Sequence, residues 1–308
     1  MKALADFKEI WLVDFEFSAP PGERPVVRCM VAREVRTDRV LRLWEDQLTS
    51  LESPPYGIDF DSLFVAYYAS AEMACHLSLG WEMPNHVLDL FVEFRSQTNG
   101  LNLPCGAGLL GALSWFDLDA ISSADKEVSR ELAMRGGPYC ASERVALLDY
   151  CQSDVDSLYK LLNVMGPHLD VPRAVYRGRY MKAVARIEHC GIPVDGPTLS
   201  KLRYCWDEIK LKLIERVDER FQVYDGQVFR TERFADFLNR EDIPWPRLPS
   251  GALDLKDETF KTMAMSYPIL NDLRELRQSL SQLKLSDIAV GADVRNRCLL
   301  SAFRSRTG

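Results

Sequence analysis

The chain has 308 residues, 47% of them hydrophobic, and a formal net charge of -7. We expect two domains, because this length exceeds the roughly 100 to 200 residues of a typical single domain. No apolar run approaches the roughly 18 residues of a membrane span, and residues 1–9 lack a signal-peptide pattern, so we expect a cytoplasmic protein without a membrane partner.

The spacing of thiols and imidazoles argues against a zinc site. The eight cysteines are scattered with no Cys-x-x-Cys pair, and the four histidines show no ligand spacing such as His-Glu-x-x-His. Carboxylates are therefore the candidate ligands for any metal ion.

Three short runs rich in β-branched and aromatic residues open the chain, at 10–17, 26–35 and 40–44. Turn residues separate them, which predicts three consecutive antiparallel strands. Two further strands are predicted at 63–68 and 87–90, each followed by a helix. Strands that first meander and then alternate with helices indicate an α/β fold with a mixed sheet covered by helices.

After residue 100 the pattern is helical. Apolar residues recur at three- and four-residue steps from Ala141 to Met165, which predicts a long helix that ends at Gly166 and Pro167. Beyond it we expect further helices, at 174–189, from Asp195 onward, at 231–240 and at 268–285.

Charge changes along the chain near a proline-containing segment at 166–173. Residues 1–170 hold 14 Lys/Arg and 26 Asp/Glu, a net of -12, whereas residues 171–308 hold 24 and 19, a net of +5. We therefore predict an α/β domain over 1–169 and a smaller, mainly helical domain over 170–308. The basic half suits electrostatic contact with a phosphate backbone, although a solvated surface explains the same balance equally well.

Two carboxylates, Asp14 and Glu16, interrupt the first apolar strand two residues apart, so their side chains share one face of the sheet. Burying two like charges side by side is costly, and a divalent cation is the usual solution. The alternative is an edge strand whose carboxylates both lie in water. On the long helix, Tyr150 and Asp154 are four residues apart and share one helix face, although the pair alone is more typical of a boundary tyrosine beside an exposed aspartate.

In this order the residues resemble the motifs of the DEDD exonuclease superfamily, and specifically the proofreading domain of A-family DNA polymerases such as those of phages. The first motif of that family, Asp-x-Glu, is matched by Asp14 and Glu16. The third, Tyr-x-x-x-Asp, is matched by Tyr150 and Asp154, which indicates the tyrosine subtype. The resemblance implies a ribonuclease H-like mixed sheet with flanking helices over residues 1–169.

The second motif of the family departs from its usual pattern here. Glu72 keeps a carboxylate where the fourth strand turns into its helix, whereas Tyr68 replaces an asparagine and Ala71 replaces a phenylalanine. Glu72 is also explained as a first-turn acid favoured by the helix dipole. Asp89 is a weaker candidate for the carboxylate of this second motif.

The resemblance implies hydrolysis of phosphodiester bonds at the 3′ end of DNA, with release of 5′-mononucleotides. Two Mg²⁺ or Mn²⁺ ions are expected among the four carboxylates, with Tyr150 orienting the attacking water. The expected substrates are single-stranded DNA and frayed 3′ ends of primer–template DNA. The metal ligands of this prediction are Asp14, Glu16, Glu72 and Asp154, and the aromatics expected to stack on terminal bases are Phe15, Phe17, Tyr67 and Tyr68.

The resemblance continues into the second half. Residues 186–195 resemble the entry to an A-family polymerase domain, and residues 303–308 resemble the approach to a Thr-Gly-Arg motif, which implies a truncated, thumb-like helical domain. The motifs of a polymerising palm are absent, so a separate polymerase subunit is a candidate partner. Two other functions remain open at this point: a catalytically impaired DNA-binding or polymerase-docking module, and a 3′-to-5′ exoribonuclease.

Overall fold

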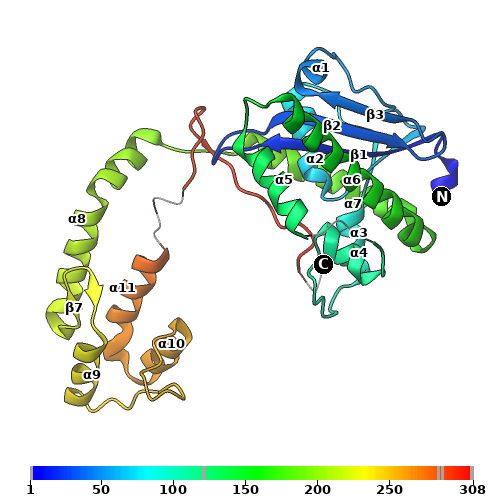
Figure 1. Cartoon of the computed structure of the whole chain (residues 1–308). Coiled ribbons are helices and arrows are strands. Elements are labelled where there is room, and N and C mark those ends of the chain that lie inside the picture. The colour runs from blue at the N-terminus through cyan, green and yellow to red at the C-terminus, as the bar shows by residue number, and fades with distance from the viewer. Residues whose placement is uncertain (1–2, 120–122, 283–284, 286–287, 306–308) are drawn as a thin grey trace. The chain divides into compact units, whose positions relative to one another are not determined.

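Five strands form a mixed sheet in the order β3–β2–β1–β4–β5 in the computed structural model, which describes residues 3–119, 123–282, 285 and 288–305 (Figure 1). The first three strands pair antiparallel, and β4 runs parallel to both β1 and β5. Their bounds are β1 Glu9–Ser18, β2 Val26–Glu34, β3 Val40–Trp44, β4 Ser62–Ala66 and β5 His86–Asp89. The predicted α/β class and the antiparallel opening of the sheet are confirmed.

The chain divides into two compact units, the first being Met1–Pro193 together with Val290–Gly308 and the second Val194–Ala289. The helices of the first unit are α1 Glu45–Thr49, α2 Ala69–Leu79, α3 Leu90–Gln97, α4 Leu109–Trp115, α5 Ser123–Arg135, α6 Ala141–Met165 and α7 Val171–Cys190. Within the described ranges, no helix is both long and apolar enough to cross a lipid bilayer.

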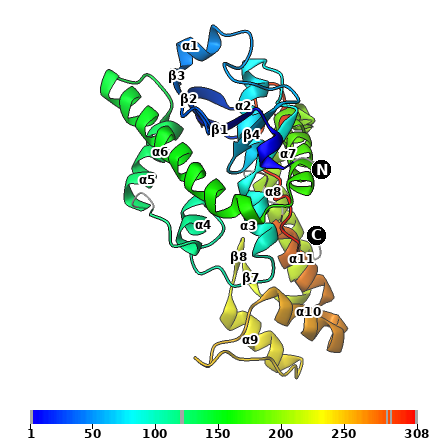
Figure 2. The same ribbon diagram turned by 90° about the vertical axis from the view of Figure 1, so that its right-hand side faces the viewer.

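Alternation along β1 sends its side chains into two cores. Ile10 and Leu12 join the core beneath α6, whereas Trp11, Val13 and Phe15 join the core shared with α2 and the C-terminal half of α7. Figure 2 shows α6 on one side of the sheet and α2 and α7 on the other. Asp14 and Glu16 follow Leu12 at two-residue steps, so their side chains lie on the same face of β1, the one directed toward α6.

The sequence predicts a boundary after residue 169, and the structure differs. Helix α7 packs closely on the sheet, because Gly178 has no side chain: a Cβ atom there would lie 1.8 Å from the carbonyl oxygen of Val87 on β5. This packing extends the first unit to Pro193.

The end of the chain returns to the first unit, which the sequence pattern does not predict. Strand β6 (Ile192–Pro193) pairs with β9 (Arg295–Asn296), and the buried Glu188 accepts a hydrogen bond from the backbone N–H of Leu300 at 2.5 Å. Residues 306–308, which complete the segment resembling a polymerase motif, lie outside the described residues.

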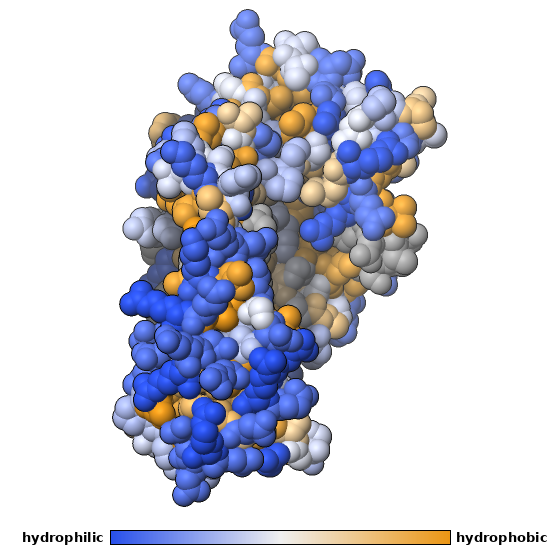
Figure 3. All heavy atoms as spheres, turned by 90° about the vertical axis from the view of Figure 1, so that its left-hand side faces the viewer, coloured by the Kyte–Doolittle hydropathy of each residue, from blue (hydrophilic) through white to orange (hydrophobic). Residues whose placement is uncertain are grey.

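The second unit is mainly helical, as predicted. Its described residues form a long helix, a hairpin, three shorter α-helices and one 3-10 turn around an apolar core of their own. The elements are α8 Gly196–Phe221, β7 Tyr224–Asp225, β8 Val228–Phe229, α9 Thr231–Arg240, α10 Asp257–Ser266 and α11 Asn271–Gln282. Hydrophilic side chains dominate its outer surface in the lower part of Figure 3.

Candidate active site

Helix α6 places Tyr150 and Asp154 over β1. Leu147, Cys151 and Leu158 pack into the core beneath the helix at four- and seven-residue steps, which fixes its rotation against the sheet. The Cys151 thiol donates a hydrogen bond to the backbone carbonyl of Asp14 over 3.2 Å. Because Tyr150 and Asp154 flank Cys151 on the helix, this contact brings both side chains to the carboxylate face of β1.

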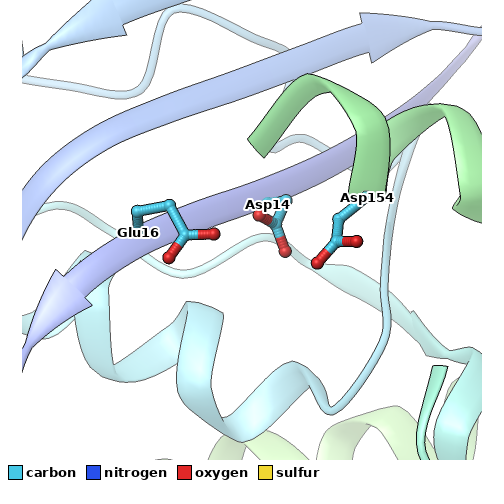
Figure 4. Close-up of side chains that lie close together, drawn as sticks. All are labelled: Asp14, Glu16 and Asp154. Carbon is cyan, nitrogen blue, oxygen red and sulfur yellow. The ribbon is translucent and has the colours of Figure 1, made fainter. Parts of the chain in front are cut away.

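Three carboxylates meet at this point. One oxygen from each of Asp14, Glu16 and Asp154 lies within 4.8 Å of the others, and Figure 4 shows the three groups directed toward one another between β1 and α6. Asp154 is buried, and the two strand carboxylates are half-buried. Like charges at this separation repel one another, and oxygen donors of this kind suit a hard divalent cation such as Mg²⁺ or Mn²⁺.

The phenol of Tyr150 stands beside this group and is only 8% exposed. Burial, together with the charges of Asp154 and Glu16, raises its pKa far above the ordinary value of 10.0. Tyr150 therefore remains a protonated O–H at every physiological pH, which makes it a hydrogen-bond donor rather than a base.

Glu72 approaches the carboxylates from α2 but does not belong to the group of three. Its side chain is 4% exposed and accepts a hydrogen bond from the backbone N–H of Phe15. Burial and the charges of Asp14 and Glu16 raise its pKa well above 4.5. Within the described part of the chain, its buried Oε2 atom has no hydrogen-bond partner.

Asp89 has a structural role instead of substituting for Glu72. Its carboxylate accepts hydrogen bonds from the backbone N–H groups of Tyr68 and Ala69 at 3.0 and 2.9 Å, and from those of Phe91 and Val92 at the start of α3. It thereby caps α3 and holds the turn that leads from β4 into α2.

Tyr68, which stands where the resembled family has asparagine, occupies the left-handed region with φ 73° and ψ 57°. Asparagine adopts this conformation readily, whereas a bulky residue does so at a cost of about 1–2 kcal/mol. The hydrogen bond from its N–H to Asp89 supports the turn. The backbone shape suited to asparagine is thus retained without the asparagine side chain.

The structure corrects the expectation for one of the four aromatic residues, Phe15. Phe15 is 3% exposed, because its odd position on β1 directs it into the core opposite the carboxylates, so it is not available for stacking on a base. Phe17 is half-buried against the same core. The hydroxyls of Tyr67 and Tyr68 donate to the backbone carbonyls of Ala107 and Leu300, and both side chains are half-buried.

A β-bulge beside the site was missed from the sequence. Glu16 pairs with Cys29 and Phe17 with Val27, which leaves Arg28 as the extra residue of β2. Its guanidinium donates to both carboxylate oxygens of Glu45, at 3.0 and 2.9 Å, and to the hydroxyl of Ser18 at 3.0 Å. Arg28 thus fixes the end of β1 two residues beyond Glu16, and no sequence signal marks it because a bulge depends on strand register.

Comparison with known proteins gives a likeness at the level of fold. No protein-family model and no curated protein sequence matches the chain. Among solved structures, it is similar to the polymerase domain of Pol1 from M. smegmatis in complex with DNA primer-template and dNTP, with a TM-score of 0.51 and 14% sequence identity. The chain shares the fold of part of that A-family DNA polymerase structure. The match covers 94% of this chain but 48% of the polymerase chain, so this chain spans about half of its length.

Proposed function

We propose that the chain is a metal-dependent 3′-to-5′ exonuclease with a ribonuclease H-like first unit, acting on DNA. The observation that carries the proposal is the meeting of Asp14, Glu16 and Asp154 within 4.8 Å beside Tyr150. These are the residues, in the order Asp-x-Glu and Tyr-x-x-x-Asp, that resemble the DEDD motifs of A-family proofreading domains. The polymerase domain to which the chain is similar is bound to DNA primer-template, which supports DNA as the partner, and we propose a thumb-like role for the second unit.

The donor set fits Mg²⁺ or Mn²⁺. Asp14, Glu16 and Asp154 would hold the ion, and Glu72 is included as a fourth carboxylate because its buried Oε2 atom has no hydrogen-bond partner among the described residues. When bound, the ion lowers the pKa of a coordinated water and stabilises the charge that develops on the phosphate.

The protein's own groups orient the reactants. Tyr150, held as a protonated phenol, donates a hydrogen bond to the attacking water or to the phosphate. Arg28 and Cys151 fix the two elements that carry the carboxylates. The products expected are 5′-mononucleotides, released one at a time from single-stranded DNA or from a frayed 3′ end of primer–template DNA.

The test is digestion of a 5′-labelled single-stranded oligonucleotide with Mg²⁺ or Mn²⁺. The proposal expects a ladder of products shortened stepwise from the 3′ end, abolished by a chelator and by the double substitution Asp14→Ala/Glu16→Ala. The matched control is Asp149→Ala/Asp156→Ala, which removes two α6 carboxylates that are 60% and 45% exposed and lie outside the group of three. Unchanged digestion by the Asp14→Ala/Glu16→Ala protein would refute the proposal.

A second candidate is a DNA-binding or polymerase-docking module without catalysis. The position of Glu72 outside the group of three carboxylates favours it. Binding of primer–template DNA with no metal-dependent hydrolysis would select this function. Digestion of a matched RNA oligonucleotide in preference to DNA would instead select an exoribonuclease.

A further inference from the structure

Helix α7 carries an unusual concentration of positive charge for a chain with a net charge of -7. It contains five basic residues and a single acidic residue, Glu188, which is buried. The like charges of Arg186 and Arg179 contribute, after burial, to lowering the pKa of Lys182. The helix therefore produces a positive potential along its length.

The exposed face of α7 alternates cations with aromatic rings. Tyr176 is 73% exposed and Tyr180 is 53% exposed, although both are large hydrophobic side chains. Arg173, whose side chain is 79% exposed, precedes them, and Arg179 and Arg186 are also exposed. At helical spacing these residues form one stripe about 20 Å long.

Few carboxylates neutralise this stripe. Arg173 pairs with Asp170 at 3.1 Å, but neither Arg179 nor Arg186 has an ion-pair partner among the residues that the structure describes. A solvated face usually mixes both charge signs, whereas every exposed charge on α7 is positive. Exposed tyrosines beside Arg179 and Arg186, which have no ion-pair partner among the described residues, match the chemistry of a flexible polyanion that also carries planar rings.

We propose that the exposed face of α7, formed by Arg173, Tyr176, Arg179, Tyr180 and Arg186, binds single-stranded nucleic acid. The guanidinium groups contact phosphates and the tyrosine rings stack on bases. Met181, Val184 and Ala185 pack the C-terminal half of α7 on the core opposite that beneath α6, so the part of this surface around Arg179, Tyr180 and Arg186 is separate from the carboxylate group. Binding requires no metal ion and holds whether or not the carboxylates hydrolyse the strand.

The experiment measures fluorescence anisotropy of a labelled single-stranded DNA of mixed sequence titrated with the full chain in a chelating buffer, so that no hydrolysis occurs. Three double variants are compared with the unmodified chain. Arg179→Glu/Arg186→Glu reverses the stripe's charge, Tyr176→Ala/Tyr180→Ala removes its rings, and Arg39→Glu/Lys160→Glu makes the same charge change at exposed positions elsewhere in the first unit. Circular dichroism confirms folding, and Arg179→Gln/Arg186→Gln replaces the reversal if that variant unfolds.

The charge reversal is expected to weaken binding by about tenfold or more and to reduce the dependence of log Kd on log salt by about 1.4, the value for two lost phosphate contacts on a single strand. The tyrosine variant is expected to weaken binding by about tenfold with an unchanged salt dependence. The control is expected to stay within about threefold of the unmodified chain. The proposal would be overturned by an equal loss of binding in the control or by unchanged binding in both stripe variants. It would also be overturned if the unmodified chain bound no DNA, a result that would point to a protein partner for this face.

Discussion

The thiol of Cys151 on α6 donates its hydrogen bond to the backbone carbonyl of Asp14 on β1, 3.2 Å away. This contact joins the two elements of the candidate site at the point where their functional side chains meet. Cys151 is fully buried, so the contact is shielded from water. The relative positions of Asp14 and Asp154 therefore depend on a residue that has no direct chemical role.

Replacing Cys151 by alanine tests this dependence. The smaller side chain leaves a void and removes the thiol hydrogen bond to the Asp14 carbonyl, so Cys151→Ala should lower the free energy of unfolding by about 1–2 kcal/mol. Displacement of α6 should reduce kcat of the proposed nuclease by about tenfold or more. Urea unfolding and the rate of nucleotide release measure the two effects, with the exposed Cys105→Ala as control. Loss of stability with an unchanged kcat would show that Cys151 only fills space.

The phenol of Tyr150 is predicted to act as a donor. Tyr150→Phe keeps the packed ring and removes the O–H, so kcat should fall by about 10- to 100-fold while stability changes by less than about 1 kcal/mol. Because the pKa of Tyr150 is raised far above 10.0, its titration should not appear in the pH–rate profile below pH 10. A rate that falls on deprotonation of a group absent from Tyr150→Phe would contradict this assignment.

Glu72 decides between a four-carboxylate and a three-carboxylate site. Glu72→Gln keeps the shape of the side chain and its acceptor for the Phe15 N–H, but it cannot carry the negative charge. If Glu72 serves the metal ion, the Mg²⁺ concentration for half-maximal activity should rise by about tenfold or more. An unchanged Mg²⁺ requirement would leave Asp14, Glu16 and Asp154 as the complete set.

Stability at acid pH should depend on His76, which is fully buried behind β1. Its Nδ1–H donates to the carbonyl of Glu82 at 2.9 Å, and its Nε2 accepts from the hydroxyl of Tyr56 at 2.6 Å, so the neutral ring satisfies both contacts. Burial lowers the pKa of His76 from 6.5 to about 4.

Between about pH 4 and pH 6.5, His76 is protonated in the unfolded chain and neutral in the folded chain. The stability that neutral His76 contributes is therefore fully present above pH 6.5 and is lost as the pH falls toward 4, by up to about 3 kcal/mol. Urea unfolding across this range should show a smaller acid loss in His76→Gln than in the unmodified chain, and no difference for the exposed His168→Gln. Parallel pH curves for the unmodified chain and His76→Gln would contradict the prediction.

Local sequence patterns were sufficient for much of this fold. Turn residues separate the first three strands, and a three- and four-residue repeat defines α6 with the predicted bounds. Alternation along β1 predicted that Asp14 and Glu16 share one face of the strand. Four-residue spacing predicted that Tyr150 and Asp154 share one face of α6. Each of these features depends on neighbours close in the sequence.

The remaining features depend on contacts between distant segments. Phe15 is buried because a second core lies on the side of the sheet opposite α6. Arg28 donates hydrogen bonds to Ser18 and Glu45 because a bulge in the pairing of β1 with β2 makes it the extra residue. The return of residues 290–305 to the first unit joins segments more than 100 residues apart. No local pattern specifies such pairings, which is why the domain boundary was placed too early.

The most direct test of the nuclease assignment is the chemical identity of the product released from a 3′ end. Incubation of single-stranded DNA with the chain and Mg²⁺ should yield 5′-mononucleotides, detected by mass spectrometry, and none when the charges of the strand pair are removed in Asp14→Asn/Glu16→Gln. Release of nucleoside 3′-phosphates, cleavage at internal positions, or undiminished release by that variant would contradict a nuclease centred on Asp14, Glu16 and Asp154.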